Sequence, residues 1–124
     1  MKFLDSNVIA YAFYTNEYTD ACQNALREGG IVDVFNLVEA FFIIEREIGS
    51  REIAQKSIKN LLKSNIQIID VDVNLLFEAL KRVDNLKLSI FDAIHYSCAA
   101  VSNCDAIISY DKDFDKLDIP REEP

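Results

Sequence analysis

The sequence has few of the residues on which tight turns depend. Of its 124 residues, three are glycine and two are proline. Short β-hairpins draw heavily on glycine, so this scarcity argues against an all-β fold rich in hairpins. Half of the residues are hydrophobic and 27% are charged, which is an ordinary globular composition. We therefore expect one domain with one core, spanning residues 1–124.

The sequence also lacks paired cysteines and long apolar runs. Its three cysteines form no CxxC pair, which is typical of free, mostly buried thiols in a reducing cytosol. The longest apolar runs fall far short of the roughly 20 residues that a membrane span needs. No charged-then-apolar signal segment precedes the first apolar stretch. We expect a soluble, cytoplasmic protein with no membrane partner.

Positive charge is scarce as well. The chain has 13 Lys and Arg against 21 Asp and Glu, for a net charge of −8. Such a chain lacks the general basic field that attracts nucleic acid, so RNA binding would need a local basic patch or bound metal ions. A glycine-rich phosphate loop, an HExxH motif and a nucleophile elbow are all missing, which excludes the enzyme classes they mark.

What the sequence does have is an acid inside an apolar stretch near its start. Asp5 lies in Lys2–Ala10, KFLDSNVIA, where an apolar run predicts a buried strand and Asp-Ser-Asn predicts its end. A lone ionised carboxylate in such a place is costly unless a cation or hydrogen-bond donors meet it. We interpret Asp5 as the end of a central strand and as a metal ligand.

Short apolar strands alternate with helical patterns along the chain, which predicts an α/β fold with a parallel sheet covered on both faces. In such sheets, ligands bind beyond the carboxyl ends of the strands. We expect a loop over 84–87 and a frayed tail over 121–124. The expected strands cover residues 2–4, 31–34, 66–69, 106–109 and a short stretch near Ile119. The expected helices cover 8–13, 19–28, 36–48 with Asn36 as its cap, 51–63, 72–83 and 89–101.

Glu39 is the only polar residue between Leu37 and Ile44. A helix that is apolar nearly all round is buried nearly all round, so Glu39 is expected to point into the interior or a cleft. We expect it in the first turn, where the helix dipole favours an anion. The alternative is a helix N-terminal acid with an exposed tip.

Asp92 and Asp111 complete the set of unusual acids. Ser89-x-x-Asp92 before an apolar run resembles a capping box, so capping and metal binding are both open for Asp92. Asp111 follows an expected strand, in an acidic loop with Asp113 in reserve as a ligand. The loop lacks the glycine and the glutamate that a calcium-binding EF-hand requires.

Together these acids predict one metal centre, because all of them fall at the same edge of a parallel sheet. Crowded carboxylates repel one another and raise one another's pKa, and a divalent cation removes the conflict. An all-carboxylate set favours Mg²⁺ or Mn²⁺ over Zn²⁺. His95 lies one turn after Asp92 and faces the same way, although a lone histidine in an apolar run is more often a packed core residue.

The ordered set of motifs resembles the four signatures of PIN-domain ribonucleases, and most closely the VapC-type toxins of toxin–antitoxin modules. The resemblance covers essentially the whole chain. The motifs are Leu4-Asp5-Ser6-Asn7-Val8-Ile9, Glu39 in its helix, Phe91-Asp92-Ala93-Ile94-His95 and Ile108-Ser109-Tyr110-Asp111-Lys112-Asp113-Phe114.

The resemblance implies a three-layer α/β/α sandwich around a central parallel sheet of four to five strands. It implies Mg²⁺- or Mn²⁺-dependent endonucleolytic cleavage of RNA, a homodimer, and an antitoxin protein that blocks the site. By position, the catalytic and metal-binding acids are Asp5, Glu39, Asp92 and Asp111. The supporting residues are Ser6, Asn7 and Ser109.

Two other functions stay open at this level. A metal-dependent phosphatase with an aspartyl nucleophile would suit Asp5, but the second aspartate expected two residues later is replaced by Asn7. A non-catalytic, nuclease-like module that binds a partner protein is the other alternative, and the intact set of acids argues against it.

Overall fold

A computed structural model describes all residues, 1–124. A five-stranded parallel sheet in the order β3-β2-β1-β4-β5 forms its centre. The strands are Lys2–Leu4 (β1), Ile31–Asp33 (β2), Gln67–Ile69 (β3), Ala106–Ile108 (β4) and Arg121–Glu122 (β5). The helices are Ser6–Tyr11 (α1), Thr19–Glu28 (α2), Val34–Ile48 (α3), Arg51–Leu62 (α4), Val73–Leu86 (α5) and Ile90–Val101 (α6), and Lys112–Lys116 is a 3-10 helix (η1).

The first strand lies at the middle of the sheet, as expected. It pairs in parallel with β2 on one side and with β4 on the other, and Phe3 lies opposite Ile31 and Ile107. The chain winds outward from β1 through β2 to β3 and then crosses to β4, so the winding direction reverses between β1 and β4. In a parallel sheet such a reversal opens a crevice beyond the carboxyl ends of the strands.

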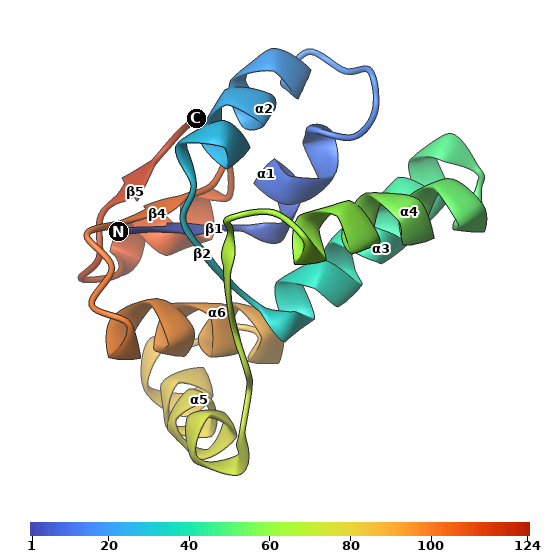
Figure 1. Ribbon diagram of the computed structural model, residues 1–124. Coiled ribbons are helices and arrows are strands. Elements are labelled where there is room, and N and C mark those ends of the chain that lie inside the picture. The colour runs from blue at the N-terminus through green and yellow to red at the C-terminus, as the bar shows by residue number, and fades with distance from the viewer.

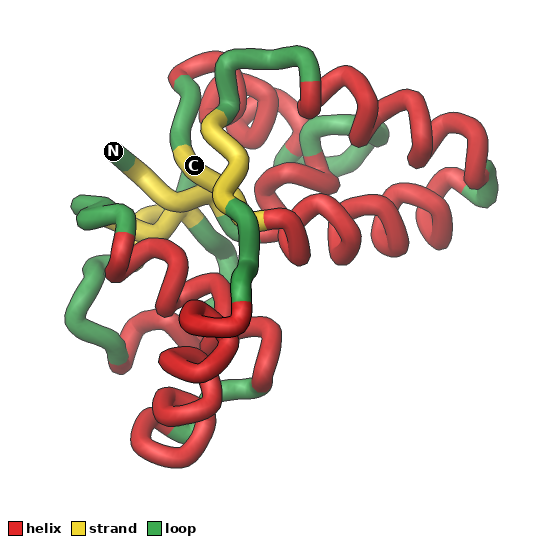
Figure 2. Tube along the Cα trace, turned by 60° about the horizontal axis from the view of Figure 1, so that its bottom comes forward, coloured by secondary structure: helices red, strands yellow, loops and turns green.

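Helices cover both faces of the sheet, which confirms the predicted α/β/α architecture (Figure 1). Successive strand residues point to opposite faces, so Phe3 packs with the residues of α5 and α6, whereas Leu4 packs with those of α1 to α4. The same alternation places Ile107 with Phe3 in the core on the α5–α6 side, and Ile108 with Leu4 in the core on the α1–α4 side. Figure 2 shows the α3–α4 pair and the α5–α6 pair on opposite sides of the strands.

Several helix boundaries differ from the sequence prediction. The cap of α3 is Asp33, not Asn36; Asn36 is the third helical residue and completes a capping box with Asp33. The helix therefore begins earlier, and Glu39 lies in its second turn, not its first. The predicted loop over 84–87 is wrong because α5 continues to Leu86 and ends at Lys87 in the left-handed conformation.

The predicted frayed tail is also wrong. Residues 121 and 122 form β5, which pairs with β4. The Arg121 side chain holds this edge strand, because its guanidinium donates to the Ser109 carbonyl at 2.9 Å and to Asp115 Oδ1 at 2.7 Å. A single arginine in an acidic tail forms no recognisable sequence motif, so the contacts of Arg121 with Ser109 and Asp115 could not be predicted.

One glycine is required by a close approach between strands. A Cβ atom at Gly30, just before β2, would lie 2.7 Å from the carbonyl oxygen of Lys2 in β1. Only glycine lets the two backbones approach this closely. The central pairing of the sheet depends on it.

Two apolar surfaces remain uncovered. On α5 the side chains of Val73, Phe77 and Leu80 are 82%, 61% and 50% exposed. Between α3 and α4 lies a cleft of about 290 Å³ lined only by hydrophobic residues, among them Val38 and Leu62. No helix is both long enough and apolar enough to cross a lipid bilayer.

Candidate metal centre

Asp5 lies where the sequence predicts it, directly after the central strand. It is the N-cap of α1, and its Oδ1 accepts a hydrogen bond of 2.8 Å from the Ser6 backbone amide. Its own amide donates to the Ile108 carbonyl at 3.0 Å, which extends the pairing of β1 with β4 by one bond. The carboxylate is therefore fixed at the reversal point of the sheet.

A hydroxyl from the next strand orients the second oxygen of Asp5. Ser109, fully buried just after β4, donates from Oγ to Asp5 Oδ2 at 2.6 Å and accepts from the Asp111 amide at 2.9 Å. Burial raises the pKa of Asp5, and the hydrogen bond from Ser109 opposes that rise. Ser109 thus connects the acid after β1 with the acid after β4.

Three carboxylates converge beyond these strand ends. Asp92, in the first turn of α6, lies with Asp111 and Asp113 so that one ligand oxygen from each falls within 4.8 Å of the others. Burial and the negative charges of Asp5 and Asp111 raise the pKa of Asp92 to about 6. Asp113, which the sequence held in reserve, is therefore inside the cluster.

Glu39 reaches the centre from the opposite side and is held by a different set of partners. Its Oε1 accepts a hydrogen bond of 2.6 Å from Ser6 Oγ and lies 2.5 Å from His95 Nε2. Burial acts to raise the pKa of Glu39, but the hydrogen bonds and charge of His95, together with Ser6, lower it overall. Glu39 is not among the three clustered aspartates.

His95 bridges Glu39 and a fully buried acid, Asp33. Its Nδ1 lies 2.7 Å from Asp33 Oδ2, so both ring nitrogens meet carboxylates. Burial acts to lower the pKa of His95, but the hydrogen bonds and charges of the two acids raise it to about 10. An imidazolium that donates on both sides is therefore the form that this geometry stabilises.

Asp33 and Asn36 are two polar residues of the site that the sequence does not predict there, since Asn36 is expected only as a helix cap. Asp33 is fully buried, and its Oδ1 accepts from the Asn36 amide at 2.9 Å, while Asn36 donates from its side chain to Ser6 Oγ at 3.0 Å. The signal that marks Asp5, an acid after an apolar strand, marks Asp33 equally. His95 was noticed, but its two partners could not be identified from a single apolar run.

The other candidate residues are placed less centrally. Asn7 follows Ser6 on α1 and lines a neighbouring cleft. Two cations near the ends of this region already have acidic partners: Lys2 forms an ion pair with Glu122 at 3.0 Å, and Arg46 forms one with Glu47 at 3.1 Å.

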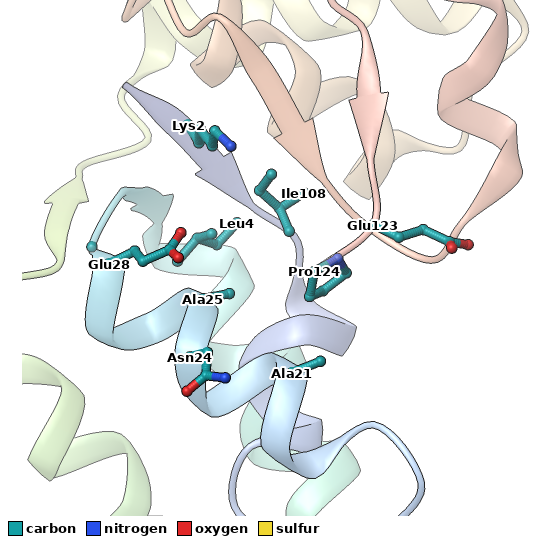
Figure 3. A pocket seen from close by; sticks show the side chains of 10 residues that line it. Lys2, Leu4, Ala21, Asn24, Ala25, Glu28, Ile108, Glu123 and Pro124 are labelled. Atoms are coloured by element: carbon teal, nitrogen blue, oxygen red, sulfur yellow. The ribbon is translucent and has the colours of Figure 1, made fainter.

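A separate cavity of about 430 Å³ lies between α2 and the strands β1 and β4 (Figure 3). Its walls include Leu4, Ala25 and Ile108, with Lys2 and Glu28 at its edge. None of the predicted acids lines it. The cavity is thus distinct from the candidate metal centre.

The donor set of the centre fits a hard divalent cation. All of its side-chain ligands are carboxylate oxygens, the chemistry that Mg²⁺ and Mn²⁺ prefer. Burial, and after it the charges of Asp5 and Asp111, raise the pKa of Asp92, and a cation would offset the repulsion among these acids. The exposed side chain of Asp113 leaves the cluster open to solvent on one side.

Comparison with known protein families places this fold. A family model described as PIN domain matches residues 2–120, and the chain belongs to the PIN domain family. The match agrees with the resemblance seen in the sequence motifs. A comparison of the sequence with curated proteins finds no match.

Solved structures share the fold at low sequence identity. The VapC20 toxin of Mycobacterium tuberculosis, which cleaves the sarcin–ricin loop, superposes with a TM-score of 0.83 at 18% identity over 100% of both chains. A toxin–antitoxin complex from Klebsiella pneumoniae gives 0.72 at 14% identity, covering 95% of this chain and 93% of that one. VapBC2 from Rickettsia felis, bound to a promoter DNA fragment, gives 0.75 at 19% identity, covering 98% and 97%.

Proposed function

We propose that this chain is a Mg²⁺- or Mn²⁺-dependent endoribonuclease, the toxin of a toxin–antitoxin pair. The observation that carries the proposal is the meeting of Asp92, Asp111 and Asp113 within 4.8 Å at the edge of the sheet where Asp5 ends β1. Membership of the PIN domain family supports nuclease chemistry. The similar folds of VapC20 and VapBC2 support the toxin assignment.

The four sequence-predicted acids, Asp5, Glu39, Asp92 and Asp111, are proposed as the ligands, with Asp113 as a fifth candidate. When bound, Mg²⁺ or Mn²⁺ would polarise a phosphoryl oxygen and lower the pKa of water. Hydrolysis adds the oxygen of water to phosphorus and breaks one P–O ester bond, and the departing alkoxide takes up a proton.

The protein's own contribution is preorganisation. The backbone of Ser6 and the hydroxyl of Ser109 fix both oxygens of Asp5, so its lone pairs point in set directions before any ligand arrives. Ser6 and His95 together hold one oxygen of Glu39, Oε1. A centre whose ligands are already ordered loses less entropy when it binds its cation and substrate.

The primary test uses an RNA labelled at both ends. Wild-type protein is expected to release two shorter fragments, each carrying one end label, in Mg²⁺ or Mn²⁺ and none in excess chelator. Asp5→Asn should release none under either condition while keeping the wild-type circular dichroism spectrum. Undiminished metal-dependent cleavage by Asp5→Asn would refute the site, and cleavage unaffected by chelator would refute the metal requirement.

We further propose that an antitoxin segment covers the apolar cleft between α3 and α4. The cleft is lined only by hydrophobic residues, and apolar surface left open in this way is typical of a protein interface. Co-expression with the product of a neighbouring gene is expected to yield a stable complex that no longer cuts RNA. A charge in the cleft, Val38→Glu, should abolish that complex but leave RNA cleavage unchanged.

The predicted homodimer is proposed to use the exposed apolar face of α5. Val73, Phe77 and Leu80 lie on this helix and contact no apolar partner layer, unlike Leu75 and Ala79, which pack in the core. Light scattering of the purified protein is expected to give twice the mass of 14.1 kDa. A Phe77→Lys variant is expected to give a monomer, and an unchanged mass would exclude this face.

A further inference from the structure

Four of the five tyrosines gather beside the metal centre. The rings of Tyr11 and Tyr18 stack with centroids 5.3 Å apart and an interplanar angle of 18°. Tyr18 and Tyr110 lie 4.4 Å apart, and Tyr14 meets Tyr11 edge to face at 6.1 Å and 89°. All four side chains are partly exposed. Aromatic rings concentrated at a surface next to a reactive site are typical of a stacking platform.

Three of these four rings border a cleft of about 510 Å³, which is in the size range of small-ligand sites. Its walls include Tyr11, Tyr14 and Tyr18 from the α1–α2 region, and Ile43 and Arg46 from α3. Unlike the cleft between α3 and α4, this one mixes aromatic, polar and charged side chains. Its lining therefore suits a ligand that has both flat apolar faces and polar edges.

Two helices, α1 and α3, contribute residues both to the cleft and to the metal centre. Asn7, which lines the cleft, follows Asp5, the N-cap of α1, by two residues. On α3, Glu39 of the centre shares one helix face with Ile43 and Arg46, four and seven residues later. The cleft thus extends about two helical turns, roughly 10 Å, away from the carboxylates.

The charges in the cleft favour a base over a phosphate. Arg46 is the only cation that lines it, and it is already paired with Glu47 at 3.1 Å, while Glu17 adds a second negative charge. Two carboxylates repel a phosphodiester backbone, but they accept hydrogen bonds from the exocyclic amino groups of nucleobases. Stacking of a base on aromatic rings does not depend on positive charge, so it can contribute to RNA binding even though the chain has a net charge of −8.

We propose that this cleft holds one unpaired nucleobase of the RNA, next to the phosphate that is cut, stacked on Tyr14. The inference rests on the proposed ribonuclease function and adds to it a subsite for one base, built from residues of α1, α3 and the segment that joins α1 to α2. Tyr14 is the ring assigned to stacking because no other aromatic ring stacks on it face to face. Tyr11, Tyr18 and Tyr110 also pack against the core, so they build the wall behind it.

The test is a double-mutant cycle between protein and RNA. The protein variants are wild type, Tyr14→Ala, Tyr14→Phe and the control Phe42→Ala, which removes a 61% exposed ring from α3 outside the cleft. The RNA substrates are a single strand that wild type cuts and the same strand with an abasic residue on either side of the cleavage point. The measurement is kcat/KM, and thermal unfolding verifies that each variant is folded.

We expect Tyr14→Ala to lower kcat/KM on intact RNA by about 5- to 100-fold, the range that aromatic stacking on a base contributes. Tyr14→Phe and Phe42→Ala should stay within about twofold of wild type, because the first keeps the ring and the second lies elsewhere. On one of the two abasic RNAs, Tyr14→Ala should cause no further loss. Equal losses on intact and abasic RNA, or intact-RNA activity equal to that of Phe42→Ala, would overturn the inference. If wild type cut no RNA at all, the proposed function itself would fail, and the inference with it.

Discussion

Ser109 donates a hydrogen bond of 2.6 Å to Asp5 although 104 positions separate the two residues in the chain. The bond joins the ends of β1 and β4, where the winding of the sheet reverses. Both groups are buried, and the same hydroxyl accepts from the amide of Asp111. The acids of the centre are therefore connected by the protein itself, independently of any cation.

Removing this hydroxyl is expected to cost stability and activity together. Ser109→Ala leaves a buried oxygen of Asp5 without its donor, which typically costs about 1–3 kcal/mol of unfolding free energy. Urea unfolding measures this loss. Ser109→Thr keeps the hydroxyl and should retain most of the cleavage rate. A Ser109→Ala variant as stable as wild type would contradict the role assigned to this bond.

Asp5→Asn is expected to separate function from stability. Asparagine is as good an N-cap as aspartate, so α1 should form normally, and its side-chain NH2 can donate to the Ser109 hydroxyl in place of accepting from it. Burial raises the pKa of Asp5, so removing its charge relieves a cost, and the melting temperature should stay the same or rise. Calorimetric titration with Mn²⁺ should show weaker binding. Unchanged Mn²⁺ affinity would remove Asp5 from the ligand set.

The raised pKa of Asp92 predicts a pH dependence of stability. Its folded value of about 6 lies above the ordinary value of 3.8, so the folded state binds the proton more tightly. The resulting stabilisation is fully present below pH 3.8 and is lost as the pH rises through about 6. In the metal-free protein, Asp92→Asn should therefore be more stabilising relative to wild type at about pH 8 than at about pH 4.

Urea unfolding at the two pH values measures this difference, with Asp118→Asn, an exposed acid, as the control. Mn²⁺ competes with the proton at Asp92, so its affinity should fall as the pH drops through about 6. A stability difference between Asp92→Asn and wild type that does not depend on pH would show that the charges of Asp5 and Asp111 do not act on Asp92.

His95 is expected to remain protonated at neutral pH. Its pKa of about 10 lies above the ordinary value of 6.5, because Asp33 and Glu39 both accept from its ring. Its contribution to stability is present below pH 6.5 and is lost as the pH rises through about 10. His95→Gln leaves the buried Asp33 and the partly buried Glu39 without a cation and should cost about 3–5 kcal/mol of unfolding free energy.

Nuclear magnetic resonance can measure the protonation state of the His95 ring directly, because His95 is the only histidine. In the folded protein both ring nitrogens should carry protons across pH 5 to 8, the range in which an unperturbed histidine loses its charge. In urea-unfolded protein the same ring should titrate near the ordinary 6.5. Titration of the folded ring near 6.5 would contradict the arrangement with Asp33 and Glu39.

Much of the fold follows from local patterns in the sequence. The strands around Phe3, Val32 and Ile107 are short apolar runs, and they alternate with amphipathic helices, which predicts a parallel sheet covered on both faces. The failures are at boundaries, where tertiary contacts decide. Asn36 is a plausible cap in the sequence, but the buried Asp33 caps the helix. Arg121 donates to the Ser109 carbonyl and so holds in a strand the tail that was expected to fray.

The candidate site was predictable only in part, for a related reason. Asp5, Asp92 and Asp111 are marked by an apolar strand or helix on one side of each acid, which is a local signal. The partnership of Asp33, His95 and Glu39 joins three separate elements, β2, α6 and α3, and only the folded chain brings them together. At the sequence level Asp113 stays in reserve because the fourth acid is the least regular one in the family that the motifs resemble.

The bare apolar face of α5 has a consequence for the protein in solution. With Val73, Phe77 and Leu80 open to water in a single chain, the repulsion between two chains of charge −8 opposes the association proposed for this face. That repulsion disappears as the pH approaches the isoelectric point of about 4.5. The dimer should therefore dissociate less readily on dilution in mildly acidic buffer than at neutral pH.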